Sequence, residues 1–393
     1  MNAPLLHEID RIAYPVVFQE ASAFKDTYAG ATDMVFFDCQ WLRPKGVASK
    51  TVIVFSHPIG GGAWLPLVTA LAQAGHHVIY ANTRYRGNDS ALVMEKCLVD
   101  LGQAIKHAKA NFGYERVVLG GWSGGGSMSL FYQQQAERPS LASTPAGDPP
   151  DLTKAGLIPA EGLMLLAAHV SRALTLTEWM DPSIRDESRP DERDCELNLY
   201  DPRNPNQPPY TEAFVARFRE AQVERNRRIT VWVKEKLDGL NARGGRQAEH
   251  CFTVHGTMMD VRWQDPTIDP NQRKPNWCYL GDPEAVNDGP VGLARFCTLR
   301  SWLSQWSYDD SKADGIACAR DVSCPVLVIG NLADDACTPS HTHRLYEAVG
   351  HDRKELHEID GATHYYIGQK QQLAEATAIC GTWLEKWGFA PAR

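Results

Sequence analysis

Short apolar runs rich in β-branched residues recur along the chain. They lie at residues 51–55 (TVIVF), 77–80 (HVIY), 116–119 (RVVL), 162–170 (GLMLLAAHV) and 325–329 (PVLVI). Near-continuous apolar runs of this length are typical of strands buried on both faces, as in a parallel sheet. Residues 33–42 (DMVFFDCQWL) also have strand character.

Helical patterns separate these runs, for example at residues 65–74 and 91–111. An alternation of strands and helices predicts a doubly wound, mostly parallel α/β sheet. The alternation stops after about residue 170 and resumes at about residue 322.

The intervening stretch combines loop-like and helical parts. Residues 181–194 and 265–284 are rich in proline and charge, whereas residues 211–241 carry Phe214 and Phe218 at helical spacing. Unstructured loops of this length are uncommon unless they are functional. We therefore expect a core of residues 1–170 and 322–393. Residues 171–321 would form a largely helical cap, inserted between the sixth and seventh core strands over the ligand-binding edge.

Composition narrows the class of protein. The 393 residues are 43% hydrophobic and 22% charged, as in an ordinary globular protein. A formal net charge of −8 argues against nucleic-acid binding. The start of the chain does not resemble a secretory signal, and no apolar stretch approaches the ~20 residues that cross a bilayer. We expect a cytoplasmic protein without a membrane partner, and the sequence leaves a homo-oligomer open.

The cysteines and histidines do not form a recognisable metal motif. Ten cysteines are scattered along the chain without a CxxC pair, which favours buried thiols over a disulfide framework. His341 and His343 have no third ligand at a typical spacing. The sequence therefore predicts neither a metal nor a cofactor.

The strongest chemical signal is a G-x-S-x-G motif at residues 121–125, centred on Ser123. An apolar strand comes directly before it and a helix-like run directly after it. This is the setting of a nucleophile elbow, a sharp turn that exposes a catalytic serine. Small neighbours are needed because the strand and the helix pack close to the turn.

A second glycine-rich loop, residues 56–62 (SHPIGGG), follows the strand at residues 51–55. Its backbone N–H groups are placed to bind the oxyanion of an acyl-transfer reaction. We expect the oxyanion donors to be the N–H groups of Ile59 and Gly124. A phosphate-binding loop is disfavoured because no Walker or dinucleotide motif follows.

A serine nucleophile needs a base and an acid that orients the base. His364 lies in a loop between a strand-like run and a C-terminal helix. The acid precedes it in chain order, after the strand at residues 325–329, where Asp334 and Asp335 are adjacent. The spacing to Pro339 favours Asp335, and Asp334 remains the alternative.

Together these motifs resemble the α/β-hydrolase family over about residues 50–170 and 322–390. Residues 86–90 (RGNDS) look like the R-G-x-x-S loop of that family. The resemblance implies an eight-stranded sheet with a Ser–His–acid triad at its carboxyl edge. The acid loop departs from the family pattern, since Gly330 lies five residues before Asp335 instead of three. Epoxide and haloalkane hydrolases of the family carry aspartate where Ser123 stands, so these activities are disfavoured.

We expect a serine hydrolase that cleaves a carboxylic ester, with Ser123, Asp335 and His364 as its triad. Its substrate would be a small apolar acyl or aromatic ester, and Trp64 and Trp122 would line the pocket. The same triad also serves thioesterases, acyltransferases and C–C bond hydrolases. A ligand-binding relative without turnover is a further alternative.

Overall fold

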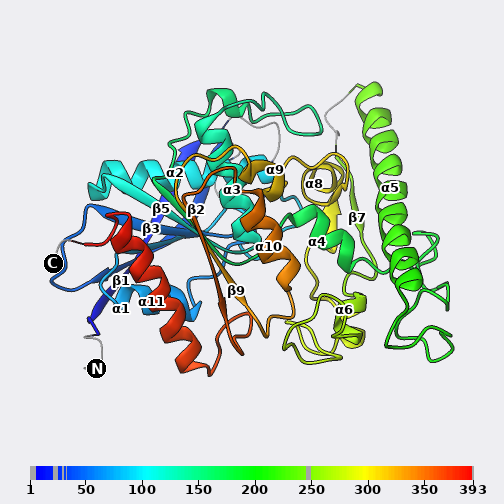
Figure 1. The fold of residues 1–393 in the computed structure, drawn as a ribbon. Coiled ribbons are helices and arrows are strands. Elements are labelled where there is room, and N and C mark those ends of the chain that lie inside the picture. Colours follow the sequence, from blue (N-terminus) through cyan, green and yellow to red (C-terminus); the bar gives the residue numbers. More distant parts are fainter. Residues whose placement is uncertain (1–5, 21–24, 29–30, 32, 245–248, 392–393) are drawn as a thin grey trace.

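A single eight-stranded sheet forms the centre of the molecule, with helices on both of its faces (Figure 1). The structure is a computed structural model that describes residues 6–391 except 21–24, 29–30, 32 and 245–248. The strands of the central sheet are β1 (Ile9–Gln19), β2 (Met34–Pro44), β3 (Thr51–Ser56), β4 (Val78–Ala81), β5 (Arg116–Ser123), β6 (Gly162–Ala168), β9 (Val326–Asn331) and β10 (Lys354–Ile359).

Their order across the sheet is β1-β2-β4-β3-β5-β6-β9-β10. Strand β2 pairs antiparallel with both β1 and β4, and the other pairings are parallel. This arrangement confirms the predicted doubly wound, mostly parallel sheet. All the predicted strands are present, whereas β1 was not predicted from the sequence.

The helices are α1 (Pro66–Gln73), α2 (Met94–Phe112), α3 (Gly124–Glu137), α4 (Arg172–Trp179), α5 (Glu212–Ala242), α6 (Val261–Gln264), α7 (Pro283–Asn287), α8 (Leu299–Ser301), α9 (Gly315–Ala319), α10 (Pro339–Ala348) and α11 (Lys370–Lys386). A 3-10 turn, η1 (Leu152–Lys154), and a π-helical turn, η2 (Trp302–Trp306), complete the set.

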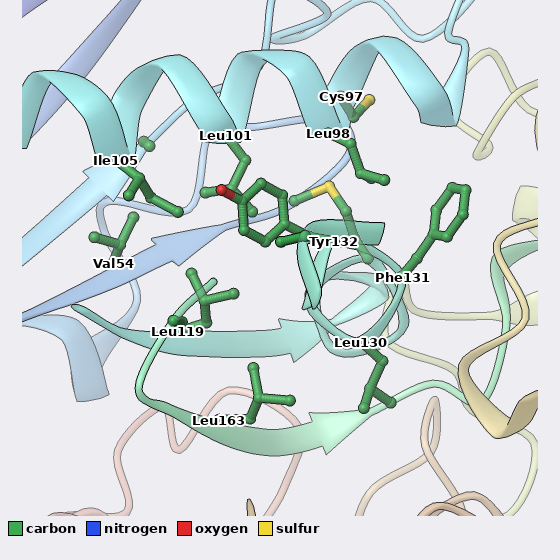
Figure 2. Close-up of a cluster of buried hydrophobic side chains, with 14 of the residues drawn as sticks. Val54, Cys97, Leu98, Leu101, Ile105, Leu119, Leu130, Phe131, Tyr132 and Leu163 are labelled. Atoms are coloured by element: carbon green, nitrogen blue, oxygen red, sulfur yellow. The ribbon is translucent and has the colours of Figure 1, made fainter. Parts of the chain in front are cut away.

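Alternate residues of the central strands belong to two different hydrophobic cores. In β6, Leu163 and Leu165 pack on one side of the sheet, and Met164 and Leu166 pack on the other. Residues of α2, α3, α9 and α10 fill the first core, and residues of α1 and α11 fill the second. Figure 2 shows part of the first core, where side chains of α2 and α3 meet those of β3, β5 and β6. Burial on both faces explains why these strands read as continuous apolar runs.

The chain between β6 and β9 contains α4 to α9 and a small two-stranded sheet of β7 (Cys251–Thr253) and β8 (Phe296–Thr298). Its long helix α5 is capped by Thr211, whose side chain accepts a hydrogen bond from the Phe214 N–H. Figure 1 places α5 at the far side of this segment from α1 and α11. The buried members of two hydrophobic clusters all lie in this segment, so it has hydrophobic cores of its own. We call residues 171–321 the insertion.

None of the described helices is long and apolar enough to cross a membrane.

Candidate active site

The carboxyl ends of the central parallel strands bring the candidate catalytic residues to one edge of the sheet. Ser123 ends β5, His57 follows β3, Asp334 follows β9 and His364 follows β10. Ligands bind at this edge of open α/β sheets, near the point where the strand order reverses. Here the reversal lies at β3 and β5, because the chain runs from β3 to β4 on one side and then crosses to β5 on the other.

Ser123 occupies the strained turn that the sequence predicted. Its backbone has φ 52° and ψ −124°, a conformation that residues other than glycine rarely adopt. The neighbouring glycines allow the turn to pack: a Cβ on Gly125 would lie 2.2 Å from the Ser56 carbonyl oxygen, and one on Gly121 would lie 2.6 Å from the Gly126 Cα. The chain has the strand, strained serine and helix of a nucleophile elbow.

His364 is hydrogen-bonded to Asp334. The distance from its Nδ1 to the Asp334 Oδ2 is 2.7 Å, and both side chains are buried. The other carboxylate oxygen of Asp334, Oδ1, accepts the N–H groups of Ala336 and Cys337 at 2.7 and 2.9 Å. Asp334 is therefore fixed from its own loop and bonds the imidazole with its remaining oxygen.

The expectation that Asp335 would contact His364 is corrected by this geometry. The spacing to Pro339 favoured Asp335, but the loop turns around the Asp334 carboxylate and directs it at the imidazole. The Asp335 Oδ1 atom is buried and accepts no hydrogen bond from the described residues. Burial, followed by the charge of Asp334, raises the pKa of Asp335 to about 7.

The pKa of His364 reflects two opposed effects. Burial alone would lower it, but the Asp334 carboxylate outweighs burial and raises the pKa above its usual value. Because Nδ1 faces the carboxylate, Nε2 remains for proton exchange with a substrate or a nucleophile.

The loop after β3 differs in detail from the predicted oxyanion site. The Ile59 N–H donates to the Nδ1 of His57 at 3.3 Å, so this donor is already engaged. An imidazole that accepts at Nδ1 carries its proton on Nε2 when it is neutral. Burial lowers the pKa of His57 to about 3, which keeps it neutral. Its Nε2 lies 3.0 Å from the position that a Cβ on Gly124 would take.

Gly124 is the first residue of α3, and its N–H therefore has no partner within the helix. The His57 Nε2–H group and the Gly124 N–H are thus neighbouring donors beside Ser123. Sequence reasoning named the loop and Gly124 but missed the His57 side chain. The only signal for it was the proline at position 58, which removes one backbone donor from the loop.

Cys337 is a further group that the sequence argument missed. The Ser123 side chain lies against its thiol, and the Cys337 Sγ is 3.4 Å from the His169 Nδ1. Burial raises the pKa of Cys337 well above its usual value, so it remains a neutral thiol. Ligand atoms of Asp334, Cys337 and His364 lie within 4.8 Å of one another. Such a donor set has the composition of a site for a soft divalent cation, but Asp334 and His364 already bond each other.

The two predicted pocket tryptophans differ in their surroundings. Trp122 is buried, with its ring centroid 6.0 Å from that of His364 and its Nε1 lacking a partner among the described residues. Trp64 is 57% exposed and packs against Tyr365, the neighbour of His364, at 5.2 Å between ring centroids. Trp122 therefore lies next to the imidazole of His364, whereas Trp64 is separated from it by Tyr365.

The insertion supplies side chains to this edge. The Trp263 Nε1 donates to the Asp335 carbonyl oxygen at 2.7 Å, and the Asn271 Nδ2 donates to the Asp334 carbonyl oxygen at 2.7 Å. The ring of Tyr279 is 6.3 Å from that of His364, and the ring of Trp179 is 5.4 Å from that of His169. The insertion therefore contacts the elements that carry the candidate catalytic residues.

Other tryptophans of the insertion lie away from these contacts. Trp302 and Trp306 stack on each other within a separate cluster of the insertion. A cavity of about 790 Å³ lies between residues 185–188, 228–232 and 252–255 of the insertion, and none of the candidate catalytic residues lines it.

The strand order, the elbow at Ser123 and the His364–Asp334 pair define an α/β-hydrolase fold with a large insertion between its sixth and seventh central strands. No family model and no curated protein matches the chain. Solved structures similar to it include a monoacylglycerol lipase from Paleococcus ferrophilus, with 14% identity over 86% of this chain and 94% of that chain and a TM-score of 0.41. Est1E from Butyrivibrio proteoclasticus is 12% identical over 90% and 95%, with a TM-score of 0.46. The esterase domain of a Rhodothermus marinus protein is 11% identical over 96% and 98%, with a TM-score of 0.47.

Proposed function

We propose that this chain is a serine hydrolase that cleaves carboxylic esters through an acyl-enzyme. Ser123 is the nucleophile, His364 the general base and Asp334 the acid of the triad. The observation that carries the proposal is the 2.7 Å hydrogen bond between His364 and Asp334, at the sheet edge where the strained Ser123 lies. Since the bond holds Nδ1 against the carboxylate, it supports Nε2 as the atom that takes the serine proton.

The reaction then follows from the chemistry of the groups. Ser123 Oγ attacks the ester carbonyl while His364 accepts its proton, and the carbonyl oxygen becomes an oxyanion. We assign the oxyanion donors as the Gly124 N–H and the His57 Nε2–H. The protonated His364 gives its proton to the departing alcohol. Water, deprotonated by His364, attacks the acyl-enzyme and releases the acid.

We also propose that residues 171–321 act as a cap that shapes the substrate site. Its support is the set of contacts between the insertion and the acid loop, together with the aromatic side chains that the insertion places near His364 and His169. Aromatic walls near the acyl-enzyme would exclude water and select apolar acyl groups.

A fluorophosphonate probe tests this function, because it reacts with activated serines. The wild-type chain should be labelled at Ser123 and should hydrolyse p-nitrophenyl esters, and Ser123→Ala should lose both properties while remaining folded. The rate should fall by roughly 10⁴-fold or more, since triad members act as a unit. Labelling that persists in Ser123→Ala would assign the nucleophile elsewhere. A wild-type chain that is neither labelled nor active on esters or acyl-CoAs would be a binding protein.

A further inference from the structure

Among the buried polar atoms near His364 that have no hydrogen-bond partner among the described residues are the Asp335 Oδ1 and the Tyr279 hydroxyl. Buried polar groups in folded proteins are almost always paired, and an exception needs an explanation. Neither group is used in the reaction derived above. They belong to different parts of the chain, because Asp335 follows β9 and Tyr279 lies in the insertion.

The two groups lie in the same corner of the site. Tyr279 packs in the same hydrophobic cluster as Ala336, which follows Asp335, and Trp263, which donates to the Asp335 carbonyl oxygen. Burial is the main cause of the raised pKa of Tyr279, and the charges of Tyr365, Cys278 and Asp335 add to it. The charge of Asp335, after burial, helps to raise the pKa of Cys278 to about 12. The Tyr279 ring lies 6.3 Å from the His364 ring. Asp335 and Tyr279 therefore belong to one cluster of residues next to the proposed base.

The backbone at Asp335 is held by neighbours that do not neutralise its carboxyl group. The Trp263 Nε1 bonds its backbone carbonyl oxygen, and Asn271 bonds that of the preceding residue. The nearby guanidinium of Arg273 directs its hydrogen bonds to four backbone carbonyls and the Asn271 side chain. Among the described residues, no lysine, arginine or histidine forms an ion pair with Asp335, although its neighbour Asp334 has His364.

The surroundings of this carboxyl group are aromatic. Trp263 donates a hydrogen bond to its backbone, and Tyr279 packs in the same cluster as Trp263. Tyr365 adds another ring here, with its centroid 4.6 Å from that of His364. A carboxylate without a counter-ion among aromatic rings fits a cationic nitrogen, which pairs with the charge and with the ring faces.

The proposed mechanism indicates which half of the ester lies next to Asp335 and Tyr279. His364 gives its proton to the leaving alcohol, so the alcohol half of the ester must lie beside the imidazole. We propose that Asp335 and Tyr279 form a subsite for an alcohol group that carries a positively charged nitrogen. The preferred substrates are then esters of amino alcohols. This inference rests on the proposed ester hydrolysis.

Two esters of the same shape separate charge from size. In acetylcholine the alcohol carries a trimethylammonium group, and in 3,3-dimethylbutyl acetate a quaternary carbon replaces that nitrogen. At pH 8, where Asp335 is mostly ionised, the wild-type chain should prefer the cationic ester in kcat/KM by about tenfold or more. Asp335→Asn should reduce this preference to within about threefold of unity, because it removes the charge and retains the shape.

Control variants show whether the effect is local. Asp352→Asn removes an exposed carboxylate from the loop before β10 and should leave the preference unchanged. Tyr279→Phe retains the ring and removes only the hydroxyl, so it should reduce the preference less than Asp335→Asn does. A preference near unity in the wild-type chain, or one that survives Asp335→Asn, would overturn the subsite.

A binding measurement separates this inference from the proposed function. Calorimetric titration of Ser123→Ala with choline should show binding that Asp335→Asn weakens about tenfold or more, whereas 3,3-dimethylbutan-1-ol should bind both variants alike. Choline binding that depends on Asp335 in a chain without ester hydrolysis would retain the subsite and reject the reaction. Ester hydrolysis with no choline binding would retain the reaction and reject the subsite.

Discussion

Asp334 and His364 are joined by a 2.7 Å hydrogen bond, although they lie thirty residues apart at the ends of two neighbouring parallel strands. Asp335, one residue along, makes no such bond. Asp334→Asn should therefore lower kcat for a neutral p-nitrophenyl ester by about 10³- to 10⁴-fold, because the imidazole loses its tautomer control and its stabilising charge. Asp335→Asn should cost much less. Steady-state kinetics of the two purified variants would show which substitution lowers kcat more. A larger loss in Asp335→Asn would assign the triad acid to Asp335.

The pH dependence of the reaction should report His364. The Asp334 carboxylate raises the pKa of His364 against the effect of burial, and the base works only when it is neutral. The kcat/KM should therefore rise with pH through a pKa above the usual histidine value of about 6.5. In Asp334→Asn the raising charge is absent, so the residual activity should have its acid limb at lower pH. Profiles of kcat/KM from pH 5 to 9 would test this. An acid limb at the same pH in both proteins would show that a group other than His364 causes it.

The His57 side chain should contribute to the rate as an oxyanion donor. His57→Phe removes the Nε2–H and retains most of the ring volume, so kcat should fall by about 10²- to 10³-fold with a smaller change in KM. His57→Gln offers a side-chain N–H and should recover part of the loss. Equal losses in the two variants would indicate that the residue only supports the loop.

Two tryptophans of the insertion form a matched pair for testing the cap. The Trp263 Nε1 donates to the Asp335 carbonyl oxygen, and the Trp306 Nε1 donates to the Ala294 carbonyl oxygen at 3.1 Å. Replacing either by phenylalanine removes one buried hydrogen bond and some packing, so each should cost about 1–3 kcal/mol of unfolding free energy. Only Trp263→Phe should also lower kcat/KM, by about tenfold, because it loosens the acid loop. Similar kinetics in both variants would argue against a role of this contact in catalysis.

The stability of the chain should depend on pH through Asp335. Its pKa is raised to about 7 by burial and by Asp334, so the folded chain retains a proton that the unfolded chain loses near pH 4. This contribution to stability is complete at low pH and is lost as the pH rises from about 4 to 7. Asp335→Asn abolishes the effect, so its stability relative to the wild-type chain should increase by about 3 kcal/mol between pH 4.5 and pH 8. Urea unfolding at the two values measures this, and an unchanged difference would contradict the assigned pKa.

The sequence predicted the central strands well because each is buried on both faces and therefore reads as an apolar run. It missed β1, whose exposed and half-buried residues give no such run. The elbow at Ser123 was predictable because its backbone strain and close packing require glycines at fixed positions. These are local requirements, which short motifs can carry.

The choice between Asp334 and Asp335 was not predictable from local spacing. It depends on two backbone N–H groups that hold Asp334 and on Trp263, which is 72 residues from Asp335 in the chain. The His57 tautomer likewise follows from one hydrogen bond within its loop. The choice of acid and the tautomer of His57 both depend on hydrogen bonds that form only in the folded chain. The pattern of residue types along the sequence therefore does not predict them.

The hydrogen bonds from Trp263 and Asn271 to the acid loop have a consequence for the evolution and engineering of this chain. Both donors belong to the insertion, and both acceptors belong to the loop that holds Asp334 against His364. A graft that exchanged residues 171–321 for the lid of another hydrolase would also remove two supports of the proposed triad. New specificities should therefore arise more readily by substitutions within the existing insertion than by its wholesale replacement.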